Sequence, residues 1–290
     1  MLDRGQELGW FESTEILSEA VVAALFGFLA LVHMFTVPNP FIKPRIFADR
    51  NFLIGMTITL AHAMLIFAVL ALMAPMMQQL MGYPVMLTGL IAAPRGLGTM
   101  FAMFTAGQLI TRMDARYMMV AGLLLASFSL YLMSHFSLMM GSWPMVWVGF
   151  LQGFGGGLVF VPMTTLMLAT IAPALRNETA SLISLVRNMS AAVGIAALQA
   201  LTIRNTATVH ARLVEGVRPD NPIFAMREPG ADFGLPGWVA GMDHTIAREA
   251  AMVAYLDSYW LLGILLAMVA PLCLLLTKPK PKPKPKRAAR

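Results

Sequence analysis

Residues 117–175 decide the fold class and read YMMVAGLLLASFSLYLMSHFSLMMGSWPMVWVGFLQGFGGGLVFVPMTTLMLATIAPAL. None of these 59 residues is Asp, Glu, Lys or Arg. A helix needs roughly 20 mainly apolar residues to cross a bilayer, so this block can hold two spans. Residues 51–94 form a second uncharged block, of 44 residues, with the same capacity. The two blocks predict an all-α, polytopic helical membrane protein.

The composition of the whole chain agrees with that fold class. Of the 290 residues, 58% are hydrophobic and 12% are charged, and the mean hydropathy is +0.70; a soluble domain has about 25% charged residues. Because too few polar residues remain to cover a globule in water, we exclude an ordinary soluble enzyme and a nucleic-acid-binding protein. The single cysteine, Cys273, excludes an internal disulfide framework.

Proline, glycine and charged residues divide the chain into about seven apolar helices. The predicted helices cover approximately residues 17–37, 51–76, 85–110, 117–133, 143–171, 179–203 and 254–276. The intervening segment 204–253 is rich in Pro, Gly and charge, and we expect it to be a mobile extracytoplasmic loop. A gate or a partner site in this segment is the alternative.

The positions of Lys and Arg predict the orientation in the membrane. Basic residues occupy every second connection, and the short connections after the second and fourth helices have none. Because cytosolic loops carry the excess of positive charge, the C-terminus is expected in the cytosol. The tail 278–290 adds five lysines and two arginines, and it should contact anionic lipid headgroups as an extended chain. The basic connections contain Lys43, Arg45, Arg50, Arg112, Arg116 and Arg176.

A glycine stripe marks the fifth predicted helix. Gly149, Gly153 and Gly157 recur every four residues, so they lie on one helix face and allow another backbone to approach closely. Pro162 follows one turn later, where it can kink the helix. Close packing alone explains the stripe, and a moving helix pair that forms a transporter gate is the alternative.

Several polar side chains fall within or near the edges of the predicted spans. Because charge is costly in hydrocarbon, they should face a cavity or each other rather than lipid. They are candidates for lining a substrate cavity or a gate, with structural pairing or snorkelling to the interface as the alternative. His62 could also relay protons. The candidates are Arg95, Gln152, Arg187, His62 and Asp257.

Signatures of enzymes and of cofactor sites are missing from the sequence. It contains no HExxH, GxSxG or GxxxxGK[ST] motif. The seventh predicted helix has no lysine that could bind retinal as a Schiff base. We therefore expect no catalytic residue, no metal site and no cofactor.

Several motifs together resemble one family of membrane proteins. They cover nearly all of the chain up to the tail, and the most specific of them contains the run Pro94-Arg95-Gly96-Leu97-Gly98. The sequence resembles the drug:proton antiporters of the EmrB/QacA type, the fourteen-helix branch of the major facilitator superfamily. The matching segments are 2–11, 40–52, 78–98, 152–155 with Pro162, and 187–188 with Gly194.

The connection between the third and fourth helices resembles a degenerate copy of the superfamily's cytosolic signature. Gly107 and Arg112 match the glycine and arginine of that signature, but Thr111 stands at its aspartate position. Asp114 follows at the next glycine position. Arg112, Asp114 and Arg116 are expected to form a local ion cluster.

The resemblance implies a fold and a domain division. Residues 1–16 would be an extracytoplasmic segment, 17–50 one extra transmembrane helix with its cytosolic linker, and 51–277 the C-terminal six-helix bundle of the transporter. The N-terminal six-helix half would be missing, and with it the principal proton-coupling carboxylates.

The resemblance also implies a function. The chain would be the C-terminal part of a proton-driven multidrug efflux antiporter in the bacterial inner membrane, with amphipathic organic compounds and protons as substrates. A non-transporting membrane subunit, or a truncated remnant that packs against a partner bundle, is the alternative.

Overall fold

The computed structural model describes residues 13–37, 40, 43–218, 220–221, 224, 226, 228, 231 and 233–277. Most of the predicted N-terminal segment and the whole tail 278–290 lie outside these residues. All regular structure in the described residues is helical, and seven helices are long and apolar enough to cross a membrane. The predicted fold class is therefore confirmed.

The helix order matches the prediction closely through the fifth span. The short 3-10 helices η2 and η4 and the π-helical turn η3 occupy connections, and a 3-10 helix, η5, extends the last span. The long helices are α1 Thr14–Thr36, α2 Arg50–Pro75, α3 Val85–Leu109, α4 Ala115–Met133, α5 Ser142–Ala169, α6 Arg176–Gly216 and α8 Pro236–Val269. The short ones are η2 Pro44–Ala48, η3 Met76–Leu80, η4 Pro173–Leu175 and η5 Ala270–Leu275.

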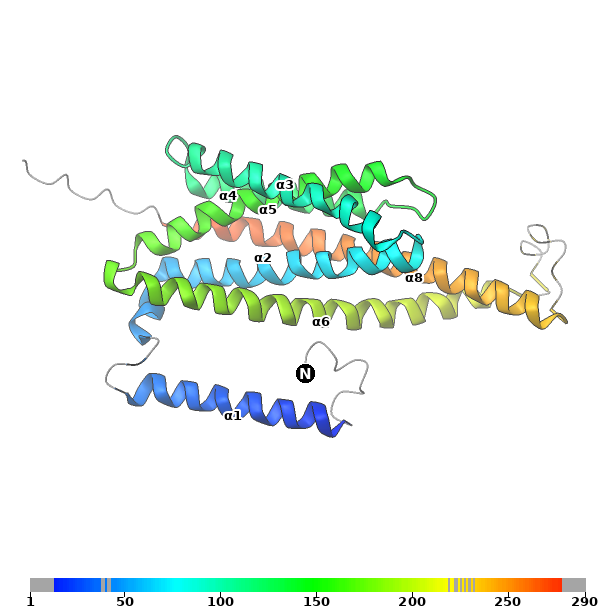
Figure 1. Ribbon diagram of the computed structural model, residues 1–290, viewed down its shortest axis with the longest axis horizontal. Coiled ribbons are helices and arrows are strands. Elements are labelled where there is room, and N and C mark those ends of the chain that lie inside the picture. Colours follow the sequence, from blue (N-terminus) through cyan, green and yellow to red (C-terminus); the bar gives the residue numbers. More distant parts are fainter. Residues whose placement is uncertain are drawn as a thin grey trace, which may run out of the picture.

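Most of the segment 204–253, which was expected to be a mobile extracytoplasmic loop, is helical. Helix α6 continues to Gly216 and α8 begins at Pro236, so the two helices run well beyond the predicted ends of their apolar spans. Figure 1 shows this pair of helices projecting past the rest of the bundle. Polar contacts hold the α6 extension against α8: His210 Nε2 lies 3.1 Å from Asp243 on the α8 extension, and Asn205 donates to Asp257 in the last predicted span at 2.9 Å.

The bundle consists of two groups of three helices. Helices α3 and α4 pack on α5, and α2 and α8 pack on α6. The groups join where α4 contacts α8 and where α2 contacts α5.

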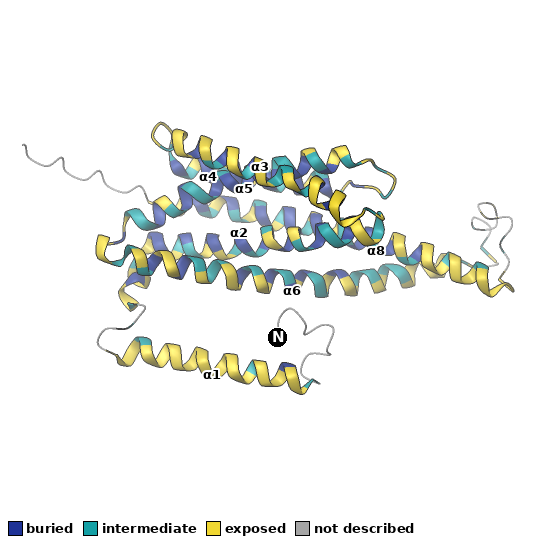
Figure 2. Ribbon diagram, in the orientation of Figure 1, coloured by how far each residue is buried: buried dark blue, intermediate teal, exposed yellow. Residues whose placement is uncertain are grey.

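Helix α1 lies apart from them in Figure 1, and almost all of its residues are exposed in Figure 2. Its apolar surface and the outer faces of the bundle suit contact with lipid acyl chains, and the lipid bilayer is the environment that these helices require.

Glycines set the spacing within the first group. A Cβ atom on Gly153 would collide with the backbone carbonyl of Arg95, and one on Gly157 would approach the Thr99 carbonyl to 2.7 Å. Gly155 points the other way, where a Cβ would lie 2.7 Å from the backbone nitrogen of Ala126. Helix α5 therefore fits between α3 and α4 because both of its sides lack side chains. Of the predicted stripe, only Gly149 has no atom near its Cβ position.

One end of the bundle is fastened by a buried amide. Asn51, at the start of α2, is 2% exposed and forms three hydrogen bonds with Thr277, just after η5. Its Nδ2 donates to the Thr277 carbonyl, and its Oδ1 accepts from the Thr277 backbone N–H and hydroxyl, each at 2.8 Å. The beginning and the end of the bundle are thereby held together.

Candidate functional site

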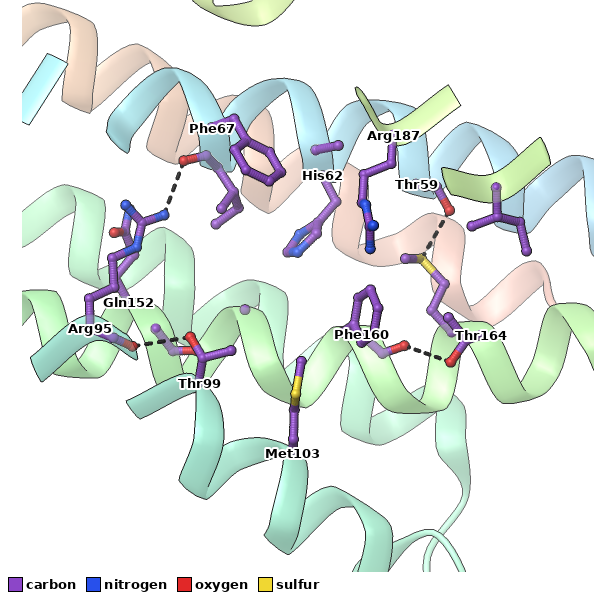
Figure 3. A pocket seen from close by; sticks show the side chains of 16 residues that line it. Thr59, His62, Phe67, Arg95, Thr99, Met103, Gln152, Phe160, Thr164 and Arg187 are labelled. Atoms are coloured by element: carbon purple, nitrogen blue, oxygen red, sulfur yellow. Dashed lines mark hydrogen bonds between the residues drawn. The ribbon is translucent and has the colours of Figure 1, made fainter. Parts of the chain in front are cut away.

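A cavity of about 260 Å³ lies inside the bundle, between α2, α3, α5 and α6 (Figure 3). It occupies the space between the two groups of helices, because α5 and α6 barely touch. Its lining residues are Thr59, His62, Ala63, Ile66, Phe67, Arg95, Thr99, Met103, Gln152, Gly153, Gly156, Phe160, Met163, Thr164, Ile183 and Arg187.

The cavity lies near the middle of the spans. His62 and Arg187 lie about three turns from the starts of α2 and α6, and Arg95 and Gln152 lie about three turns from the starts of α3 and α5. Helices α2 and α6 run antiparallel to α3 and α5. The four residues therefore lie at a similar depth in the membrane, although their positions are counted from opposite ends of the bundle. About three turns is roughly half of a 30 Å hydrocarbon core.

The polar groups of one half of the cavity are incompletely paired. Arg95 Nη2 donates to the Ile66 carbonyl at 3.1 Å, whereas its Nη1 is buried and has no partner in the described part of the chain. Gln152 is 0% exposed, and both of its amide atoms lack a hydrogen bond within the described chain. Closer to Arg187 (Figure 3), His62 Nδ1 is buried and has no partner among the described residues either. Buried polar atoms in proteins usually have a partner, so these groups are suited to bind a guest molecule.

The backbone around Arg95 is held in place by Thr99. The Thr99 hydroxyl lies 3.1 Å from the Arg95 carbonyl, one turn earlier, and 3.1 Å from the Gly153 carbonyl on α5. The missing side chain at Gly153 allows this approach. The close packing of α3 on α5 thus fixes the backbone position of Arg95, and with it the position of the Arg95 side chain at the cavity.

The other half of the cavity pairs a cation with an aromatic ring. The Arg187 guanidinium carbon lies 5.4 Å from the centre of the Phe160 ring, within the range of a cation–π contact. Figure 3 shows Arg187 beside His62, with Phe160 across the space on α5. Neither Arg95 nor Arg187 forms an ion pair with a carboxylate in the part of the chain that the structure describes.

Comparison with known proteins identifies the family. A sequence profile described as Major Facilitator Superfamily matches residues 18–195. The chain belongs to this superfamily. The predicted membership of the major facilitator superfamily is thereby confirmed.

Similar curated proteins are exporters and resistance proteins of bacteria. The chain is 29% identical over 278 residues to "Multidrug export protein EmrB" of Escherichia coli K12, covering 93% of the chain and 54% of that protein. It is 27% identical over 284 residues to "Fatty acid resistance protein FarB" of Neisseria gonorrhoeae, covering 96% of the chain and 56% of that protein. A third, "Colistin resistance protein EmrB" of Acinetobacter baumannii, is 26% identical over 234 residues, 78% of the chain and 44% of that protein. The chain thus spans about half the length of the curated relatives it matches.

The structure brings four of the five predicted cavity residues together. Arg95, Gln152, Arg187 and His62 all line the cavity of this superfamily bundle. Asp257 does not, because it lies on the exposed face of α8, where it accepts a hydrogen bond from Asn205. Helix α8 packs against α4 and α6, and no residue of α8 lines the cavity.

The connection that resembles the superfamily's cytosolic signature contains a weak ion pair. Arg116 Nε lies 4.0 Å from Asp114 Oδ1, and the same oxygen accepts the Arg116 backbone N–H at 3.3 Å at the start of α4. Gly107 and Arg112 are exposed, and a Cβ atom on Gly107 would meet nothing within 4 Å. Of the expected cluster, the structure shows the Asp114–Arg116 part.

Sequence reasoning missed the aromatic and hydroxyl residues of the cavity. Phe160 and Thr164 continue a face of α5 that begins with Gln152 and Gly156, each four residues from the next. That spacing was visible next to the glycine stripe. Thr59, Thr99 and Met103 carried no comparable signal, because single hydroxyl and thioether side chains are common throughout membrane helices.

Proposed function

We propose that this chain is the C-terminal part of a proton-driven multidrug efflux antiporter, and that the cavity between α2, α3, α5 and α6 contacts the substrate. The observation that carries the proposal is the buried, unpaired amide of Gln152 beside Arg95 near mid-depth of the spans. Transporters of this architecture bind substrates near the bilayer midplane, where two repeats meet. The names of the similar export and resistance proteins agree with such a role.

The proposal includes a partner bundle and an orientation. The matched relatives are about twice as long as the chain, and a second six-helix bundle would cover the cavity. The cavity lining in the described chain includes no Asp or Glu, so the carboxylates that couple transport to protons would belong to that second bundle. The basic connections support a cytosolic C-terminus in a bacterial inner membrane.

An efflux assay tests the proposal. The chain is expressed in an efflux-deficient bacterial host, alone and together with the N-terminal half of a similar full-length exporter, and the export of an amphipathic dye is followed by fluorescence. We expect export only from the pair. Failure of the pair to export any of a panel of dyes, although both halves reach the membrane, would favour a non-transporting subunit or remnant. Export by the chain alone would contradict the need for a partner bundle.

Filling the cavity should stop export without unfolding the protein. A Cβ atom on Gly156 would find only Ile66 Cδ1, at 3.9 Å, so a larger side chain there can extend into the cavity. We expect Gly156→Leu to lower dye export by the pair at least about tenfold, whereas Gly156→Ala should retain it. The measurement is the initial export rate, normalised to the amount of protein in the membrane. Equal rates for the two variants would mean that the substrate does not occupy this cavity.

A further inference from the structure

The fixed charge inside the cavity has one sign. Two arginines line it, and the lining residues of the described chain include no carboxylate. The described Asp and Glu side chains that form ion pairs do so elsewhere, as Glu178 does with Lys43 and Asp114 with Arg116. Charge within a membrane span is costly unless it is compensated. A guest that carries a negative charge would supply the compensation that the described chain lacks.

Arg187 has donors left for such a guest. Its guanidinium carbon lies 5.4 Å from the centre of the Phe160 ring, and its N–H groups form no hydrogen bond or ion pair within the described residues. Guanidinium groups bind carboxylates and similar anions through two parallel hydrogen bonds. The Arg187 N–H groups are therefore available to a molecule in the cavity, beside the Phe160 ring.

Arg95 and Gln152 add donors at the other end of the cavity. Arg95 Nη2 donates to the Ile66 carbonyl, whereas Nη1 is buried and has no partner among the described residues, and the Gln152 amide offers both a donor and an acceptor. The rest of the lining is largely apolar, including Ile66, Phe67 and Met163. A molecule with an apolar body and an anionic group matches both kinds of surface.

The same cavity is unfavourable for a cationic molecule. It would face two guanidinium groups with no carboxylate to offset them in the described lining. The face of Phe160, which could otherwise attract a cation, is already covered by Arg187. We propose that this cavity selects amphipathic molecules that carry a carboxylate or another anionic group, and that Arg187 binds this anionic group. The inference rests on the proposed function of the cavity and adds the substrate class.

The test compares three probes of nearly equal shape and different charge. The purified full chain in lipid nanodiscs is dialysed to equilibrium against 2-naphthoate, 2-naphthamide or 2-naphthylmethylammonium, and uptake by empty nanodiscs is subtracted. We expect 2-naphthoate to bind at least about tenfold more tightly than the amide, because a hydrogen bond to a charged group is stronger than one between neutral groups. The ammonium probe should bind no better than the amide.

Variants assign the selectivity to Arg187. We expect Arg187→Gln to remove most of the preference for 2-naphthoate, and Arg187→Lys to retain a part of it. Arg212→Gln is the matched control, because Arg212 is exposed on the extension of the same helix, outside the cavity. Circular dichroism checks that each variant keeps its helical content. If Arg187→Gln does not fold, Arg95→Gln is the second variant, and we expect it to weaken 2-naphthoate several-fold.

The outcomes separate this inference from the proposed function. Equal binding of all three probes, abolished by Gly156→Leu, would overturn the charge selectivity and leave the cavity as a site for amphipathic molecules. Preference for the ammonium probe would overturn the inference in the same way, as would a preference for 2-naphthoate that survives both arginine substitutions. Absence of binding by every probe would contradict the proposed function of the cavity, and the inference with it.

Discussion

Gly153→Ala is expected to destabilise the bundle strongly, whereas Gly156→Ala, on the same helix, should cause no loss of stability. A Cβ atom on Gly153 would collide with the Arg95 carbonyl, and α3 would have to move away from α5 to accept it. At Gly156 the nearest atom, Ile66 Cδ1, is 3.9 Å away. Overpacking usually costs about 1–3 kcal/mol and sometimes more, and a backbone neighbour cannot yield by changing rotamer.

The pair of variants can be compared by thermal unfolding in detergent micelles. Alanine has a higher helix propensity than glycine by about 1 kcal/mol, so Gly156→Ala should unfold at the wild-type temperature or slightly above it. Gly153→Ala should unfold well below it. Equal unfolding temperatures would mean that α3 and α5 are not in the close contact described above.

Asn51→Ala is expected to loosen the end of the bundle where α2 begins. The change removes three hydrogen bonds with Thr277 and leaves the backbone carbonyl and N–H of that residue without their partners. A buried polar group that loses its partner costs about 1–3 kcal/mol. Because the bonds join the first helix of the six-helix bundle to the segment after η5, we expect the loss to appear as exposure of this C-terminal segment.

Limited proteolysis and thermal unfolding measure this effect. Asn51→Ala should show faster cleavage after η5 and a lower unfolding temperature than the wild type. Thr57→Ala is the control on the same helix, since Thr57 is exposed and its hydroxyl bonds only the Leu53 carbonyl, one turn earlier. If Asn51→Ala behaves like Thr57→Ala in both assays, the Asn51–Thr277 contact does not fasten the bundle.

The membrane spans could be predicted because a long apolar run without charged residues is a direct sequence signal for a membrane helix. The uncharged block 117–175 contains most of α4 and all of α5, and the block 51–94 contains nearly all of α2 and the first part of α3, with breaks at glycine, proline and polar residues. The extensions of α6 and α8 carried no such signal. They are rich in polar residues and are held by contacts such as His210 with Asp243, which join positions 33 residues apart.

The candidate site was predictable for its charged and amide residues and less so for the others. Arg95, Arg187, His62 and Gln152 could be singled out because polar groups are rarely placed inside a span without a role. Asp257 met the same criterion and lies on the exposed face of α8 instead. In a membrane helix both the lipid-facing and the packed sides are apolar, so the sequence pattern says little about helix rotation. The contacts of Gly153 and Gly155 with α3 and α4 determine that rotation, and they are set by tertiary packing.

Cysteine protection tests most directly whether this cavity holds the substrate. Cys273, the single native cysteine, is buried and is replaced by serine. Met103→Cys then places a thiol in the cavity lining, and Met139→Cys places one in the exposed connection between α4 and α5. Each variant is treated with N-ethylmaleimide in membranes, in the assembled pair, with and without a saturating exported dye. We predict that the dye slows labelling of Met103→Cys several-fold and leaves Met139→Cys unchanged. Labelling of Met103→Cys at the same rate with and without dye would contradict the account.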